Sequence, residues 1–126
     1  MKLVLATQNP KKLKEMNEIL SHLGVEVVSE AELGVRIEVE ETGETFTDNA
    51  RLKATAVMQA TGLPAVADDS GLCVDALNGG PGVYSARFGG EGLDDKGRYT
   101  LLLEMLRGQT DRAAHFHTSI VCAFPN

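Results

Sequence analysis

Short apolar runs alternate with amphipathic stretches along most of the chain, and this alternation predicts an α/β fold. Residues 2–7, KLVLAT, form an apolar run that stops at polar residues, which is typical of a buried strand. Residues 9–24 follow with apolar side chains every three or four positions, as in an amphipathic helix. Asn9 can cap this helix, Pro10 suits its first turn and Gly24 suits its end.

The remaining pattern predicts further strands and helices in alternation. Strands are expected at 25–29, 35–39 and 113–124, and helices from about 45 to 61, ending at Gly62, and from a cap at Asp94 to near Gly108. Residues 64–68 and 72–77 are expected to be two strands on either side of an Asp-Asp-Ser-Gly turn. The glycine-rich stretch 78–92 is too long for a simple connection and is therefore a candidate functional loop.

Composition narrows the class of protein. The 126 residues, 43% apolar and 24% charged, predict a single globular domain over 1–126. A net charge of −6 gives no basis for binding DNA, RNA or an anionic membrane surface. Cys73 and Cys122 lack the spacing of a zinc or redox site and are interpreted as reduced core residues, and no signal peptide or membrane span is found, so a cytoplasmic location is expected.

The stretch ATQNPKKLKE is the first candidate site. A strand is expected to end at Thr7, and a helix to begin at Pro10 with Lys11 and Lys12 in its first turn. Free backbone N–H groups, the helix dipole and two lysines would attract phosphate there. The alternative is a solvated first turn with no ligand.

Asp68 and Asp69 form the second candidate site. Two carboxylates at the end of a strand suit Mg²⁺ coordination or general-base work, because α/β folds place ligands at that edge of the sheet. Side chains alternate along a strand, so if one carboxylate faces a metal the other faces away. The alternative is a plain Asp-Ser-Gly turn.

Acidic residues before the expected second helix are the third candidate. Glu38, Glu40 and Glu41 could contribute a carboxylate that completes a metal site with Asp69, or they could belong to a solvated loop. Lys53, on the helix itself, is either an exposed helix lysine or a phosphate contact.

Four stretches together resemble a known family. They are LATQNPKKLKE, EETGETFTDNARLKA, PAVADDSGLCVDALNGGPGVYSARFGG and AHFHTSIV. Taken together they look like the family of inosine/xanthosine triphosphate pyrophosphatases, which hydrolyse non-standard purine nucleoside triphosphates (dITP, ITP, XTP) to the monophosphate and pyrophosphate. The resemblance implies an elongated mixed α/β sheet flanked by helices, Mg²⁺ as cofactor and a homodimer.

The resemblance also implies roles for individual residues. Glu41 and Asp69 would hold Mg²⁺, with Asp68 close by, and Asp69 would be the catalytic base. The residues that would contact the substrate are Thr7, Gln8, Asn9, Pro10, Lys11, Lys12, Lys53 and Ser70. Gln8 stands where glycine is frequent in the family.

One part of the family pattern is missing from this sequence. Members of the family continue into an F-G-Y-D segment and a later S-H-R motif that hold the purine base, and neither motif occurs here. The chain is therefore expected to be cut short, to carry the phosphate and metal half of the site, and to aggregate or form an unusual dimer through exposed strand edges. The resemblance favours an Mg²⁺-dependent pyrophosphatase. The alternative is a nucleotide- and metal-binding module with little or no catalysis, and a receiver-like phospho-acceptor domain is disfavoured because the acidic pair is central in the sequence.

Overall fold

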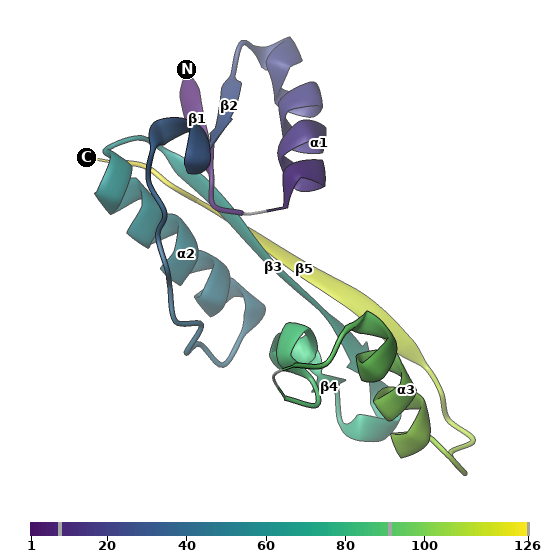
Figure 1. Ribbon diagram of the computed structural model, residues 1–126. Coiled ribbons are helices and arrows are strands. Elements are labelled where there is room, and N and C mark those ends of the chain that lie inside the picture. The colour runs from purple at the N-terminus through teal and green to yellow at the C-terminus, as the bar shows by residue number, and fades with distance from the viewer. Residues whose placement is uncertain (8, 91, 126) are drawn as a thin grey trace. The chain divides into compact units, whose positions relative to one another are not determined.

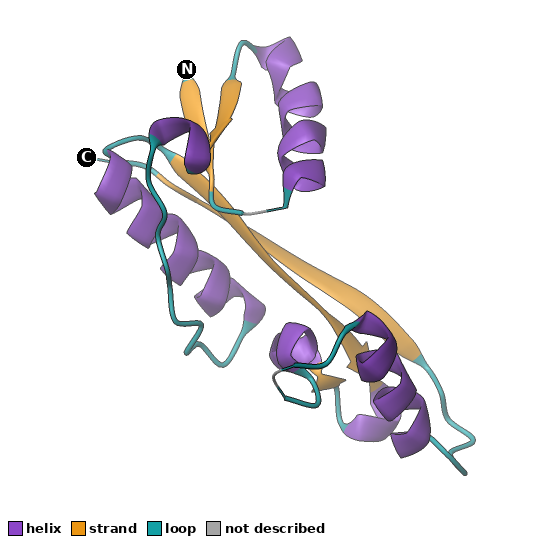
Figure 2. Cartoon of the chain, viewed as in Figure 1, coloured by secondary structure: helices purple, strands orange, loops and turns teal. Residues whose placement is uncertain are grey.

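The computed structural model describes residues 1–7, 9–90 and 92–125, except for the side chain of Arg87, and shows helices and strands in alternation (Figures 1 and 2). The strands are β1 (Lys2–Leu5), β2 (Glu26–Ser29), β3 (Ala65–Val74), β4 (Gly80–Pro81) and β5 (Ala114–Ala123). The α-helices are α1 (Pro10–Leu20), α2 (Phe46–Thr61) and α3 (Asp95–Met105). Short 3₁₀-helices cover Ser21–Leu23, Ala31–Leu33, Asp75–Leu77 and Gly82–Arg87. The α/β class predicted from the sequence is confirmed.

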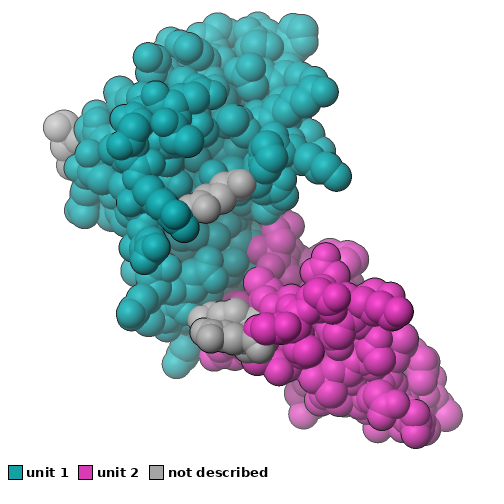
Figure 3. Space-filling view, in the orientation of Figure 1, with its two compact units in different colours: residues 1–69, 119–126 teal, residues 70–118 magenta. Residues whose placement is uncertain are grey.

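The strands join in a mixed sheet in the order β2-β1-β3-β4, with β5 also paired to β3. β1 runs parallel to β2 and to β3, and β4 is antiparallel to β3. The chain divides into two compact units, residues 1–69 with 119–126 and residues 70–118 (Figure 3). The long strands β3 and β5 contribute residues to both units.

In the first unit, the strands lie between α1 and α2 (Figure 1). Successive side chains of a strand point to opposite faces, and this alternation divides the apolar residues into two clusters. One cluster packs against α1 and contains Leu3, Leu5, Val27 and Val66 with Leu13, Met16 and Leu20 of the helix. The other includes Val4, Ala6, Val28, Ala65 and Ala67 with Ala54 and Val57 of α2. β1, β2 and the start of β3 are thus buried on both faces, as expected of parallel strands, whereas β5 leaves Ile120 and Cys122 exposed.

Helix ends follow the sequence signals closely. The Asn9 side chain accepts a hydrogen bond from the backbone N–H of Lys11 at 3.0 Å, which caps α1 directly before Pro10. Thr45 caps α2 in the same way, and Gly62 ends that helix with a left-handed φ of 70°, which only glycine adopts without strain. The predicted boundaries at these positions are confirmed.

In the second unit, Asp94 caps α3 by accepting from the Gly97 N–H at 2.8 Å. The glycine-rich stretch contains β4 and the 3₁₀-helix Gly82–Arg87. Its Ser85 hydroxyl accepts from the Leu72 N–H at 2.9 Å and donates to the Gly82 carbonyl at 2.7 Å. The stretch is therefore tied to β3 and is not a simple connection.

Three predictions from the sequence are wrong. Cys73 is only partly buried and Cys122 is exposed, so neither is a core residue, although both are free thiols. Residues 35–39 keep the expected alternation of burial but form no strand, because no neighbouring strand pairs with them. Residues 68–71 do not turn, because β3 runs through them without a break. Pairing with β5 overrides the local turn preference there: Ser70 lies opposite Thr118, and the Asp75 N–H donates to the Ala113 carbonyl at 3.0 Å.

Candidate functional site

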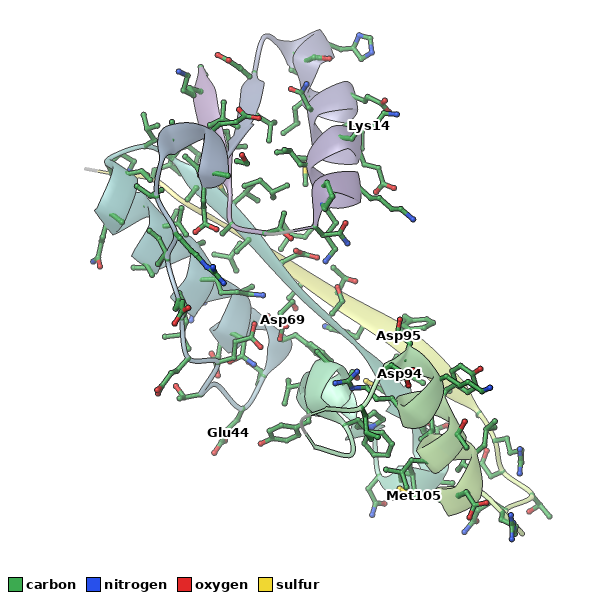
Figure 4. All side chains as sticks on the ribbon, in the orientation of Figure 1. Lys14, Glu44, Asp69, Asp94, Asp95 and Met105 are labelled. Carbon is green, nitrogen blue, oxygen red and sulfur yellow. The ribbon has the colours of Figure 1, made fainter. Side chains whose placement is uncertain are left out.

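The candidate site lies in the first unit, at the carboxyl end of β1 and beside β3. The chain leaves β1 toward β2, whereas it leaves β3 toward β4, so the connections diverge between β1 and β3. Ligands of open α/β sheets bind at such a switch point. The register pairs Leu5 with Val66, which places Asp68 and Asp69 just beyond the end of β1. Asp69 is labelled in Figure 4.

The loop between β1 and α1 brings one lysine to the acidic pair. The Thr7 hydroxyl accepts from the Asn9 N–H at 3.2 Å, and Asn9 caps the helix. From the first turn of α1, the Lys12 ammonium contacts the Asp68 carboxylate at 2.7 Å. Lys11 is exposed, and Gln8 lies outside the described residues. The loop geometry is that expected of a helix N-terminus available to an anion.

Asp68 and Asp69 point to different partners, as the alternation along a strand predicts. Asp68 faces Lys12 of α1, whereas the Asp69 carboxylate lies near Asn49 and Lys53 of α2. Asp69 is only 8% exposed, and Asn49 is completely buried. Burial raises the pKa of Asp69, and the Glu41 and Asp68 charges add to this, while Lys53 and the Asn49 hydrogen bond oppose it. The charged form of Asp69 is thus held in an unfavourable environment, which is common for functional carboxylates.

Asn49 is a residue of the site that the sequence analysis missed. Its amide nitrogen donates to the Asp69 carboxylate at 3.3 Å, and its amide oxygen accepts from the Gly43 N–H at 2.8 Å. Asn49 precedes Lys53 by one helical turn, and residues at this spacing share a face of a helix. The spacing of Asn49 and Lys53 was the sequence signal that could have identified Asn49. Through its two hydrogen bonds, Asn49 connects Gly43, in the loop that follows Glu41, to Asp69.

Lys53 is the centre of the charge arrangement. Its ammonium group lies 3.1 Å from a Glu41 carboxylate oxygen, 3.8 Å from an Asp69 carboxylate oxygen and 2.6 Å from the backbone carbonyl oxygen of Asp68. The Lys53 side chain is 22% exposed, so it is not the freely solvated helix lysine considered as an alternative. The structure brings together Glu41, Asp69 and Lys53, and leaves Glu38 and Glu40 exposed.

These oxygens suit a hard cation. Mg²⁺ prefers oxygen ligands and is commonly held by one or two carboxylates together with substrate phosphates, rather than by a complete protein cage. Two carboxylates and one carbonyl converge here, and within residues 1–7, 9–90 and 92–125 no group of three or more His, Cys, Asp or Glu side chains is arranged to hold a metal. Glu41 and Asp69 are therefore the two carboxylates that could hold a divalent cation here.

Ser70 follows Asp69 in β3 and belongs to the second unit. Its hydroxyl lies 2.9 Å from the Thr118 hydroxyl of β5, and either can be the donor. Contact between Ser70 and a substrate stays a prediction.

A cavity of about 380 Å³ lies beside the loop that follows β1. It is lined by Thr7, Asn9, Pro10, Leu13, Ser29, Glu30, Ala31, Val35 and Arg36, all of them in the first unit. Glu30 is 7% exposed, and burial raises its pKa against the opposing effect of a hydrogen bond from the Ile37 backbone.

No helix within the described part of the chain has the length and apolar character needed to cross a membrane.

Comparison with known proteins identifies relatives of this chain. The dITP/XTP pyrophosphatase of Desulforamulus reducens is 54% identical over 128 residues, covering 100% of this chain and 64% of the relative. That of Leptospira interrogans is 48% identical over 118 residues, covering 94% of this chain and 60% of the relative. This chain thus spans less than two thirds of the length of these relatives.

Solved structures of Ham1 proteins have the same fold as this chain. The Coxiella burnetii HAM1 protein superposes with a TM-score of 0.93 at 43% identity, and the Staphylococcus aureus Ham1 protein with 0.91 at 41%; each comparison covers 99% of this chain and 64% of the other. The sequence profile of the Ham1 family matches residues 3–126. The chain belongs to the Ham1 family.

Proposed function

We propose that this chain supplies the phosphate and metal part of a pyrophosphatase that hydrolyses dITP, ITP and XTP to the monophosphate and pyrophosphate. The observation that carries the proposal is the convergence of Lys53, Glu41 and Asp69, together with the contact of Lys12 with the adjacent Asp68. The names of the relatives support the substrate class, since several dITP/XTP pyrophosphatases are about 50% identical in sequence to this chain.

Asp69 is proposed as the catalytic base. Asn49 donates a hydrogen bond to one oxygen of the buried Asp69 carboxylate, which would hold this group in a fixed direction toward a water molecule. The carboxylate would orient a water molecule and accept its proton as the water oxygen attacks phosphorus and the P–O bond to the leaving group breaks. Glu41 and Asp69 would hold Mg²⁺, which would neutralise phosphate charge.

The lysines are proposed to hold the triphosphate. Lys12 lies in the first turn of α1, where backbone N–H groups and the helix dipole also favour an anion. Lys53 would contact phosphate from α2. We carry Thr7, Gln8, Asn9, Pro10, Lys11, Ser70 and Asp68 forward from the family resemblance as further contacts to substrate or metal. A homodimer and a cytoplasmic location are parts of the same proposal.

The alternative is a nucleotide- and metal-binding module with little or no catalysis. Such a module would bind ATP and ITP alike, because it would hold the triphosphate and not the purine base.

Pyrophosphate release from ITP, XTP and ATP, with and without Mg²⁺, tests these proposals. A pyrophosphatase releases pyrophosphate from ITP and XTP in preference to ATP, and D69N lowers the rate at least about 100-fold, as loss of a general base does. K14M is the control, because Lys14 is an exposed lysine of α1 and should leave the rate unchanged. Near-normal turnover by D69N would show that Asp69 is not the base. Equal binding of ITP and ATP without turnover by the wild type would favour the module.

A further inference from the structure

Lys53 and a divalent cation would need the same oxygen atoms. The Lys53 ammonium contacts Glu41 at 3.1 Å and lies 3.8 Å from Asp69, and these are the two carboxylates that would hold Mg²⁺. Its shortest contact, 2.6 Å, is to the backbone carbonyl of Asp68. The cation of this lysine therefore lies among the oxygens that a metal would take in the same unit of the protein.

Charge balance explains why the lysine lies there. Asp69 is almost completely buried and Glu41 is largely buried, with 28% of its side chain exposed, and two such carboxylates repel one another unless a cation lies near them. One ammonium group compensates part of this charge. Adding a divalent cation to the same oxygens would bring two cations together, which is unfavourable unless an anion enters with the metal.

We propose that Lys53 makes metal binding conditional on phosphate: its ammonium competes with free divalent cations for Glu41 and Asp69, and phosphate removes the competition by drawing Lys53 toward itself. This inference rests on the proposed function. Metal and phosphate then bind with positive coupling, since each is favoured by the state that the other produces. The site then binds the metal–phosphate complex more tightly than the free metal ion, and Lys53 is the residue that determines this preference.

The test measures binding rather than turnover. Free Mn²⁺, a paramagnetic substitute for Mg²⁺, is titrated at pH 7.5 and counted by electron paramagnetic resonance. The preformed Mn²⁺–pyrophosphate complex is titrated separately by water-proton relaxation. K53M removes the charge, K53Q also removes it but can still donate to the Asp68 carbonyl, and K14M removes a charge from the exposed surface of α1. Thermal unfolding shows that each variant is folded.

The wild type and K14M should bind free Mn²⁺ weakly and the complex more tightly. K53M and K53Q should bind free Mn²⁺ at least about fivefold more tightly than the wild type, the lower end of typical coupling, and should lose the preference for the complex. Unchanged or weaker affinity of both folded variants for free Mn²⁺ would overturn the inference while leaving the proposed function in place. Failure of the wild type to bind the complex would overturn both the coupling and the proposed function.

Discussion

Replacing Asp69 by Asn should stabilise the fold at neutral pH, although it removes the proposed catalytic base. Asp69 is 8% exposed, and burial is the largest cause of its raised pKa. Asparagine has nearly the same shape and no charge, and its amide oxygen can still accept from Asn49. Lys53 keeps its contacts with Glu41 and the Asp68 carbonyl.

The sign of the effect follows from linkage between protonation and folding. A carboxyl whose pKa is higher in the folded than in the unfolded state makes the protein lose stability as pH rises from the unfolded pKa through the folded one. Burial raises the pKa of Asp69, so removing its charge should be stabilising at pH 7. We expect D69N to raise the free energy of unfolding by about 0.5–2 kcal/mol, the usual range for a single stabilising substitution, with a corresponding rise in the melting temperature.

The assay is thermal unfolding of wild type and variant between pH 4 and pH 7.5. The advantage of D69N should shrink toward pH 4, where Asp69 becomes protonated in the wild type as well. D68N is the matched control. It removes the charge of the adjacent residue, Asp68, and with it the 2.7 Å ion pair with Lys12, so the free energy of unfolding should fall by about 0–1 kcal/mol. A D69N protein that is less stable than wild type at pH 7, or whose advantage does not change with pH, would show that the buried charge is not a source of instability.

Three further predictions concern residues around the acidic pair. Asn49→Ala should lower the free energy of unfolding by about 2–3 kcal/mol, because it leaves the Gly43 N–H and a buried Asp69 oxygen without a partner. Gly43→Ala should have a similar effect, since an added Cβ would lie 2.7 Å from the Asn49 amide oxygen. Denaturant unfolding checks both variants. A fall of less than about 0.5 kcal/mol in the free energy of unfolding of each would contradict a structural role for the contact between Gly43 and Asn49. Lys12→Met should weaken pyrophosphate binding about tenfold and reduce its dependence on salt, as measured by calorimetry at two ionic strengths, because one charge contact to phosphate is removed. An unchanged affinity at low salt would exclude Lys12 from the phosphate site.

Local signals predicted what is determined locally. Asn9 and Pro10 mark the start of α1, and Thr45 and Gly62 mark the ends of α2, because capping uses only neighbouring residues. Residues 35–39 show the limit of such reasoning, since a strand needs a partner that the pattern of one segment does not reveal.

Long-range contacts account for the rest of the difference. The turn expected at residues 68–71 is replaced by continuous strand because β5 pairs with β3 from far along the chain. Lys12 and Asp68 are 56 positions apart, and Asn49 and Asp69 are 20 positions apart, so no local pattern could establish either contact. The family resemblance supplied most of the candidate residues but not Asn49, and the structure adds which of them in the first unit make contact.

The uninterrupted course of β3 through Asp68 and Asp69 has an evolutionary consequence. Adjacent strand residues serve opposite layers here, one carboxylate meeting Lys12 of α1 and the next lying among the residues of α2. A loop can absorb an inserted or deleted residue, but a one-residue change within a strand turns every following side chain to the other face. Gain or loss of a single codon just before Asp68 would therefore exchange the two carboxylates. Variation of this site is confined to substitution, and length changes are expected to accumulate in the connections around it.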